Sequence, residues 1–186
     1  MRSEESRVTL PGEKLRRRLI RMLKLDQGVR CRMFASAVRE GPSLMRVDRA
    51  DRILTRLLTA IIRENGWPTI SAVGREAARS AATVLLHSPD ASLPERVLPT
   101  LEKLAARGEV EPWCVAYVTD RVLVDRGLPQ RFGTQVETRG SRIVLVQTED
   151  VDRLDLIRQS TGLPPLALYL NLLSRQFATR VGVAWE

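Results

Sequence analysis

The sequence contains only one histidine and two cysteines, and these low numbers exclude several kinds of site. A metal site that needs two imidazoles from one chain cannot form, because His87 is the single histidine. Cys31 and Cys114 are too few for a disulfide framework or for a zinc site built from cysteines. No apolar run approaches the roughly 20 residues that a membrane-spanning helix needs, so the sequence predicts no integral membrane protein.

Short catalytic motifs are also missing. The sequence has no Walker loop, dinucleotide-binding fingerprint, nucleophile elbow or cysteine–histidine signature. Residues 1–14 carry acidic side chains and lack an apolar core, so they do not read as a secretory signal. We therefore expect a cytoplasmic protein whose cysteines stay reduced, with no cofactor. No metal-ligand motif of recognised spacing occurs, but two aspartates and the histidine could assemble a mixed oxygen–nitrogen site, so the sequence leaves open whether a metal is bound.

Arginine supplies almost all of the positive charge, and this charge is unevenly placed. The chain has 30 basic and 22 acidic side chains, a net charge of +8, and only three of the basic residues are lysines. Residues 1–50 hold 13 basic and 6 acidic side chains, a net of +7, whereas residues 51–186 hold 17 and 16. The positive charge is therefore concentrated in the first quarter of the chain.

Basic residues are densest between Arg16 and Lys24, on a predicted helix. A basic stripe attracts nucleic acid, anionic lipid or an acidic partner. No aromatic residue lies between Arg2 and Arg32, so the interleaved aromatics of a nucleic-acid surface are missing and nucleic acid is not the expected partner. A solvated helix face explains the same pattern, and the sequence leaves both interpretations open.

A hydrophobic content of 44% and a length of 186 residues predict one folded domain with its own core. The spacing of apolar residues and the helix-ending signals predict helices over 13–39, 43–64, 71–87, 92–108, 111–124, 148–161 and 164–177. Strand patterning occurs only over 132–137 and 142–146, which flank a turn at 138–141. The expected fold is mainly α with one small β-hairpin (α+β), a compact single-domain helical bundle over 13–178. Residues 1–12 are expected to form a flexible N-terminus and 179–186 a C-terminal tail.

Asp26 occupies a position on the apolar face of the first predicted helix, between Met22 and Val29. A buried carboxylate is costly unless it is paired, and Arg30, four residues on, is placed to pair with it. Two interpretations stay open from the residues alone. The pair is either structural or a carboxylate and guanidinium directed into a pocket.

His87 ends a helix face of apolar and small residues that includes Ala77 and Val84. It lies at the helix C-terminus, where the helix dipole favours a protonated imidazole. Asp90 follows closely, and an acid that orients a histidine is the arrangement that general acid–base catalysis needs. The alternative is a histidine that caps the last carbonyl groups of its own helix.

Asp120 continues the helix face of Trp113 and Tyr117, while Arg121 points elsewhere on the same helix. The two residues are therefore predicted to play separate parts, one inward and one along the surface. The segment 130–135 then gathers amide, hydroxyl and guanidinium groups around a glycine, just before a strand. Such groups suit the lining of a polar ligand site or the start of a hairpin equally well.

Several short motifs follow one another along the chain. They are Gly66-Trp67-Pro68, Val73-Gly74, His87 with Asp90, Ala116-Tyr117 with Asp120-Arg121, Gln130, and Gly133-Thr134-Gln135. In this order they resemble a bacterial family that is known only as domain of unknown function number six-six-two-four. The resemblance runs over about residues 15–169 and is most specific over 120–135. It implies no reaction, so it strengthens the choice of residues more than the choice of chemistry.

The resemblance adds polar positions and also shows departures. The matching polar or small positions are Asp26, Arg30, Asp51, Thr55, Arg158 and Gly162. Asn65 stands where the family often has histidine, and Phe132 stands at a tyrosine-like position. Leu86 replaces the glutamine expected before the histidine, and a lost amide there implies a substrate that differs within the family.

Together these observations predict an enzyme that acts on a small molecule or a modified peptide, in one pocket that gathers residues from distant parts of the chain. Hydrolysis, elimination and cyclisation all suit one histidine and carboxylates without a cofactor, so a hydrolase, lyase or cyclase is favoured. The candidate catalytic residues are His87, Asp120, Asp90 and Asp26. The candidate substrate-binding residues are Arg30, Arg121, Gln130, Thr134, Gln135, Arg158, Trp67 and Asp51.

Two other functions remain open from the sequence. A non-catalytic accessory protein would bind a ligand, or would dock on a partner through the basic N-terminal helix, and salt would weaken such docking. A structural helical module would use its polar residues for salt bridges alone. The sequence predicts neither the substrate nor the oligomeric state.

Overall fold

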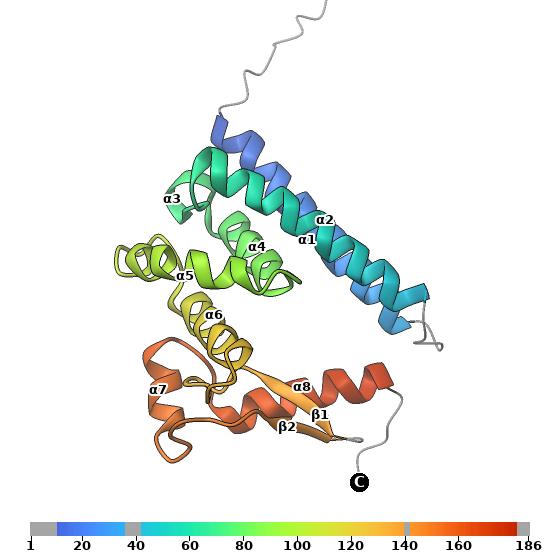
Figure 1. Cartoon of the computed structure of the whole chain (residues 1–186), viewed down its shortest axis with the longest axis vertical. Helices are drawn as coiled ribbons and strands as arrows, with labels where there is room; N and C mark the ends of the chain where they lie inside the picture. The colour runs from blue at the N-terminus through green and yellow to red at the C-terminus, as the bar shows by residue number, and fades with distance from the viewer. Residues whose placement is uncertain (1–10, 36–41, 140–141, 182–186) are drawn as a thin grey trace, which may run out of the picture.

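The computed structural model describes residues 11–35, 42–139 and 142–181 and confirms a mainly helical fold with one small hairpin (Figure 1). The helices are α1 (Pro11–Ala35), α2 (Pro42–Asn65), α3 (Ile70–Val73), α4 (Arg75–Leu86), α5 (Ser92–Ala105), α6 (Pro112–Asp125), α7 (Leu154–Ser160) and α8 (Leu166–Val181). The strands are β1 (Val136–Arg139) and β2 (Arg142–Leu145). Helix α1 begins before residue 13 and α8 continues past 178, while the rest of the predicted flexible ends, 1–10 and 182–186, lies outside the described residues.

The hydrophobic core lies where α1 and α2 pack on α4. Leu19 of α1 and Leu54 and Leu58 of α2 are almost completely buried there, as their spacing on amphipathic helices requires. Helix α4 presents alanines such as Ala77 and Ala81, which lack bulk and let the neighbouring helices approach closely. Figure 1 shows α1 and α2 as a long pair along one side, with α4 and α5 beside them.

A glycine divides the helix predicted over 71–87 into α3 and α4. Gly74 has a φ of +81°, a left-handed conformation that side-chain-bearing residues rarely adopt, and it ends α3 with a bond from its N–H to the Ile70 carbonyl. The alanine-rich pattern on both sides of Gly74 continues the helical period, which is why one helix was expected. The break lets α4 turn into the core.

Glu111 joins the start of α6 to α4. Its carboxylate accepts hydrogen bonds from Arg75 and Arg79 of α4 and from the indole N–H of Trp113. These bonds, above all those from Arg79, lower the pKa of Glu111 to about 2 against the desolvation cost of partial burial. The clamp sets the direction of α6, which carries Asp120 and Arg121.

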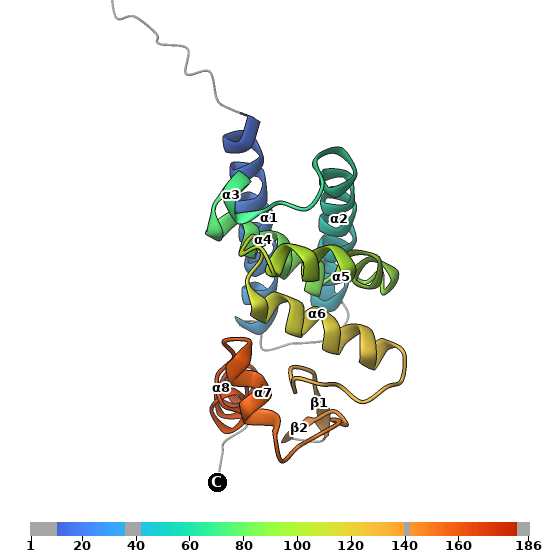
Figure 2. The ribbon, with the colours of Figure 1, turned by 90° about the vertical axis from the view of Figure 1, so that its left-hand side faces the viewer.

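The C-terminal part forms a smaller layer beyond α6 (Figure 2). Strands β1 and β2 are antiparallel, with Val136 opposite Leu145 and Glu137 opposite Val144. Helix α8 packs on β2 and on α7. The rings of Tyr117 of α6 and Tyr169 of α8 meet edge to face, with their centroids 6.4 Å apart, within the usual range of about 4.5 to 7 Å for aromatic pairs. This contact joins the smaller layer to α6.

Candidate functional site

Two helices bring an aspartate, an arginine and the single histidine together. Asp26 of α1 is fully buried, and its Oδ1 lies 2.8 Å from Nδ1 of His87 at the end of α4. Arg30, one turn further along α1, places its Nε 3.3 Å from the same oxygen, which confirms the predicted pairing of residues 26 and 30. The His87 side chain remains 32% exposed, so the ring is held from inside and open on its other side.

The protonation of Asp26 decides which ring nitrogen of His87 carries the hydrogen. Burial alone would raise the pKa of Asp26, but the hydrogen bond from His87 and the charge of Arg30 outweigh it and lower the pKa below its ordinary value. An ionised carboxylate only accepts, so Nδ1 donates to it, as Gln27 Nε2 does at 2.7 Å. The Nε of Arg30, 3.2 Å from Nδ1, then donates to the carboxylate and not to the ring.

This assignment leaves the other ring nitrogen, Nε2, with its lone pair. No hydrogen bond to Nε2 occurs within the part of the chain that the structure describes. A buried carboxylate that fixes the tautomer and an open Nε2 are the features of a histidine ready to accept a proton.

Asp51 of α2 completes the cluster through Arg30. Its Oδ1 lies 2.7 Å from Nη2 of Arg30, and burial raises its pKa although Arg30 opposes the shift. With both carboxylates ionised, two negative charges face one guanidinium and the cluster carries a net charge of −1.

Arg121 of α6 fixes the backbone on both sides of His87. Its guanidinium donates to the carbonyl oxygens of Leu86 and, at 2.7 Å, of Ser88. His87 itself is the C-cap of α4, and its N–H bonds to the Thr83 carbonyl at 3.1 Å. Arg121 therefore positions the histidine by satisfying carbonyl groups that the end of a helix leaves free.

The structure corrects the predicted partner of His87. Asp90, which lies three residues after the histidine, does not hold the ring. Its carboxylate accepts the N–H of Ser92 at 3.0 Å and lies 3.6 Å from Arg96, so it caps the start of α5. Asp90 takes this role because it lies two residues before Ser92, the first residue of α5, whereas Asp26 meets the ring through tertiary packing.

A second group of predicted residues surrounds Asp120, which is also fully buried. Its two carboxylate oxygens accept the backbone N–H groups of Arg131, Phe132 and Thr134 at 2.7 to 2.9 Å, and the Thr134 hydroxyl at 2.8 Å. Asp120 thus points inward, as predicted. Arg121 points a different way, as also predicted, but it bonds to carbonyl groups at the end of α4 and does not lie along the surface. Asp120 holds the segment 131–134 against α6.

Arg158 of α7 holds the same segment from its carbonyl side. Its Nη1 donates to the carbonyl oxygens of Phe132 and Gly133 at 2.8 and 2.9 Å, and its guanidinium lies 4.8 Å from the centre of the Tyr169 ring. Gly133 has a φ of +65°, and a Cβ there would stand 2.9 Å from a methyl group of Leu154. The segment is therefore fixed on both sides, and glycine is required at its centre.

The remaining predicted residues are also built into the scaffold. The buried amide of Gln130 donates to the carbonyl groups of Gln135 and Val146 and accepts the N–H of Gln135, so it holds the start of the hairpin together. The side-chain amide of Gln135 donates to the Thr134 hydroxyl at 3.1 Å. Trp67 is 6% exposed and packs in the core.

The predicted residues thus form two groups and not one. Asp26, Arg30, Asp51 and His87 make one group, and Asp120 with the segment 130–135 and Arg158 makes the other. No hydrogen bond or ion pair joins the carboxylate of Asp120 to the ring of His87 within the described residues. Arg121 connects the two groups. It follows Asp120 directly in sequence, and its guanidinium donates to the carbonyl groups on both sides of His87.

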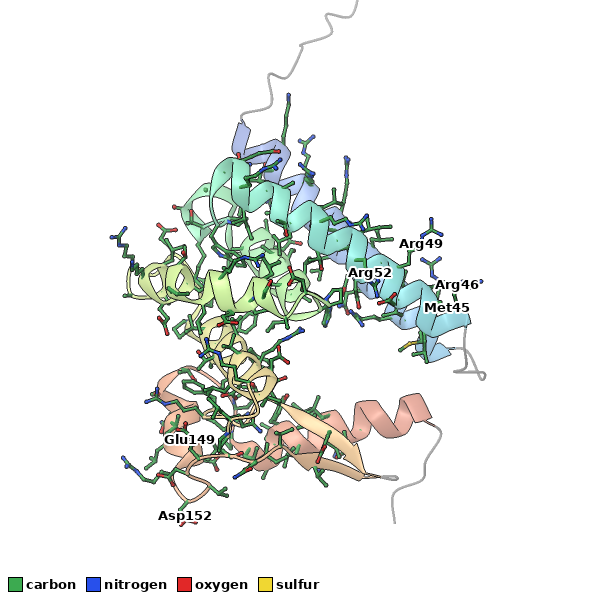
Figure 3. The ribbon with its side chains drawn as sticks, viewed as in Figure 1. Met45, Arg46, Arg49, Arg52, Glu149 and Asp152 are labelled. Carbon is green, nitrogen blue, oxygen red and sulfur yellow. The ribbon has the colours of Figure 1, made fainter. Side chains whose placement is uncertain are left out.

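A cavity of about 590 Å³ lies between α2 and the turn that follows His87. It is lined by Arg52, Thr55, Arg56, Thr59, Ala60 and Arg63 of α2 and by Pro89 and Asp90 of the turn after His87. Sequence analysis did not select the three arginines. Their spacing of four and seven residues places them on one face of α2, which is the signal that would have identified them. Figure 3 shows Arg52 midway along that helix.

Other kinds of site find no support in the residues that the structure describes. In that part of the chain, no three histidine, cysteine, aspartate or glutamate side chains gather as metal ligands would. Cys31 and Cys114 are free. None of the described helices has the length and apolar character to span a membrane.

Comparison with known proteins gives a family but no relative of known activity. The family model described as a family of unknown function, DUF6624, matches residues 13–182. No curated protein and no solved structure matches the chain.

Proposed function

Because the chain belongs to the family of unknown function DUF6624, its reaction must be argued from the site itself, and we propose an enzyme in which His87 performs acid–base chemistry. The observation that carries this proposal is the buried, ionised Asp26 on Nδ1 of a histidine whose ring is 32% exposed. The substrate is a small molecule or a modified peptide that reaches the exposed side of the ring.

In the proposed mechanism, Nε2 takes a proton from the reacting group and later returns it. In a hydrolysis this proton comes from the attacking water, in a cyclisation from the attacking group, and in an elimination from carbon. The imidazolium formed in this step is stabilised by Asp26 directly, and Arg30 and Asp51 hold that carboxylate in place. His87 both accepts the proton and returns it, so this proton transfer needs no cofactor.

The proposal predicts the chemical reactivity of His87 without knowledge of the substrate. Diethyl pyrocarbonate acylates unprotonated imidazole nitrogen, and His87 is the single histidine, so the ultraviolet signal of the reaction reports on it alone. Asp26→Asn replaces the ionised carboxylate, which only accepts, by a neutral amide that can also donate to Nδ1. The tautomer is then no longer fixed, and we expect acylation at least about tenfold slower. Asp90→Asn is the matched control and should react at the wild-type rate. Equal rates for all three proteins would contradict the proposal.

A second function, docking of a partner on α1 and α2, is supported by a separate observation. Two cavities of about 510 and 480 Å³ lie along these helices and share Leu25. Their apolar lining includes Met22, Leu54 and Ile53, and Leu25 and Ile53 are 45% and 42% exposed. The basic lining residues are Lys14, Arg17, Arg18, Arg21, Arg32, Arg46 and Arg49, and no acidic residue lines either cavity. We call this surface the α1/α2 groove.

The chemistry of the α1/α2 groove points to one kind of occupant, an acidic amphipathic helix of a partner protein. An apolar floor accepts the apolar face of such a helix, and basic side chains on both rims match an acidic opposite face. Figure 3 shows Arg46 and Arg49 toward the N-terminal end of α2, at the right of the view, and the acidic Glu149 and Asp152 at the lower left, away from them. The basic rims of the groove therefore attract a negatively charged partner.

A defined peptide tests the groove. A fluorescent 18-residue helix with leucines on one face and glutamates elsewhere (about five turns) should bind, and binding should weaken steeply as salt is raised. Leu25→Glu should weaken binding about tenfold or more, and Leu156→Glu, at an exposed leucine of α7, should leave it unchanged. Equal binding of a peptide with the same composition and scattered leucines, or of anionic vesicles in its place, would contradict a helix-binding groove.

A further inference from the structure

We propose that the cavity between α2 and the turn after His87 binds the phosphate group of a phosphate monoester. The inference rests on the proposed function in one respect, because it makes this phosphate part of the substrate on which His87 acts. The phosphate-binding site itself is inferred only from the side chains that line the cavity, and it does not depend on the role of His87.

The charges at the cavity match a dianion. Among the residues that line it, Arg52 is paired with Asp48 at 2.9 Å, and Asp90 is paired with Arg96 at 3.6 Å. Arg56 has no ion pair within the described residues, and Arg63 has only a 3.9 Å contact with the exposed Glu64. Two guanidinium groups therefore carry uncompensated charge at one cavity.

A phosphate monoester suits this arrangement better than a carboxylate does. It carries a charge of about −1.5 to −2 near neutral pH and has three strong acceptor oxygens, whereas a carboxylate carries −1 on two oxygens. Guanidinium groups bind phosphate oxygens in a bidentate way, which uses several donors of each arginine. Arg56 and Arg63 are spaced by seven residues, so they project from the same face of α2, two turns apart.

Thr55 gives a second, independent indication of a ligand. It lines the cavity and is 6% exposed, yet its hydroxyl makes no hydrogen bond within the described residues. A buried hydroxyl without a partner costs free energy, and an acceptor oxygen brought by a ligand removes that cost. Thr59 differs, since its hydroxyl donates to the Thr55 carbonyl at 2.9 Å.

Two residues that line the cavity are close in sequence to members of the acid–base group. Thr55 lies one turn after Asp51, whose carboxylate holds Arg30 beside His87. Asp90 lies three residues after His87, at the rim of the cavity. A volume of about 590 Å³ is larger than a phosphate group needs and falls in the range of small-molecule sites, so the cavity also has room for the rest of the ester.

Calorimetry with phenyl phosphate tests the inference on the whole protein. Titrations at low salt and about pH 7.5, above the second pKa of the phosphate near 6, should show saturable binding that weakens when the pH is lowered to about 5. Arg56→Gln should weaken binding tenfold or more and Thr55→Val several-fold. Arg107→Gln, at an exposed arginine that does not line the cavity, should bind like the wild type.

Three further titrations show whether the site recognises phosphate and whether His87 takes part in binding. They use benzoate, inorganic phosphate and the His87→Asn variant. Benzoate should bind at least tenfold more weakly than phenyl phosphate, and inorganic phosphate should compete with phenyl phosphate for the site. His87→Asn should keep the wild-type affinity, because the phosphate is held by α2. No binding, equal binding of benzoate, or an equal loss in Arg107→Gln would overturn the inference, while the acylation of His87 described above would still decide the proposed acid–base role.

Discussion

Replacing Asp120 with alanine is expected to lower the free energy of unfolding by about 4 kcal/mol. The substitution removes both acceptors of a buried carboxylate and leaves the N–H groups of Arg131, Phe132 and Thr134 without partners. Arg158 then holds only the carbonyl side of the segment 131–134, so the hairpin and α7 should loosen together. Urea unfolding followed by circular dichroism measures the loss.

Asp125→Ala is the control for this prediction. Asp125 lies on the same helix, is partly exposed, and forms only a 3.4 Å ion pair with Arg121, so its loss should cost less than about 1 kcal/mol. If Asp120→Ala were as stable as the wild type, the structural role assigned to this carboxylate would be wrong, and the catalytic role predicted from the sequence would be the better explanation.

The second large effect is expected on a reaction rate. An activated ester such as 4-nitrophenyl acetate is hydrolysed by imidazole bases and nucleophiles, and His87 is the single histidine of the chain. We expect His87→Asn to lower the protein-dependent rate on the order of 100-fold, the low end of the range for general acid–base catalysis. Asp26→Asn should lower it to a similar extent, because the two residues act as one unit.

Matched variants distinguish this effect from a loss of folding. Asp90→Asn removes the other carboxylate near His87 in sequence and should keep the wild-type rate, since that carboxylate caps α5. Circular dichroism of each variant shows whether the helices are intact. A folded His87→Asn protein with the wild-type rate would remove the histidine from the proposed mechanism.

The periodic parts of the fold could be predicted from the sequence because they depend on local spacing. Helical spacing gave most helices within a few residues, and the change to strand spacing gave the hairpin. The ion pair of Asp26 with Arg30 could also be predicted, since residues four apart meet on a helix. Some bounds were wrong: β1 spans Val136–Arg139 and does not begin at 132, and α7 begins at Leu154 and not at 148. Gly74 was a further exception, because a positive φ depends on how α4 packs and not on the neighbouring residues.

The partners of the buried polar residues could not be predicted, because they come from packing between distant elements. Asp26 and His87 are 61 residues apart in the chain, and nothing in either segment marks the other as its partner. Asp90 is closer to His87 in sequence, but its carboxylate accepts the N–H of Ser92 at the start of α5 and does not hold the ring. Asp26 and Asp120 show the same signal, an aspartate on an apolar face, yet one binds an imidazole and the other binds backbone N–H groups.

The tautomer of His87 is the most direct test of the proposed site. Long-range proton–nitrogen correlation spectra of the neutral ring contain the signals of one histidine and show which nitrogen carries the hydrogen. The arrangement with Asp26 requires the hydrogen on Nδ1 and a free lone pair on Nε2. A neutral ring with its hydrogen on Nε2, unchanged by Asp26→Asn, would contradict the assignment of His87 as an acid–base residue.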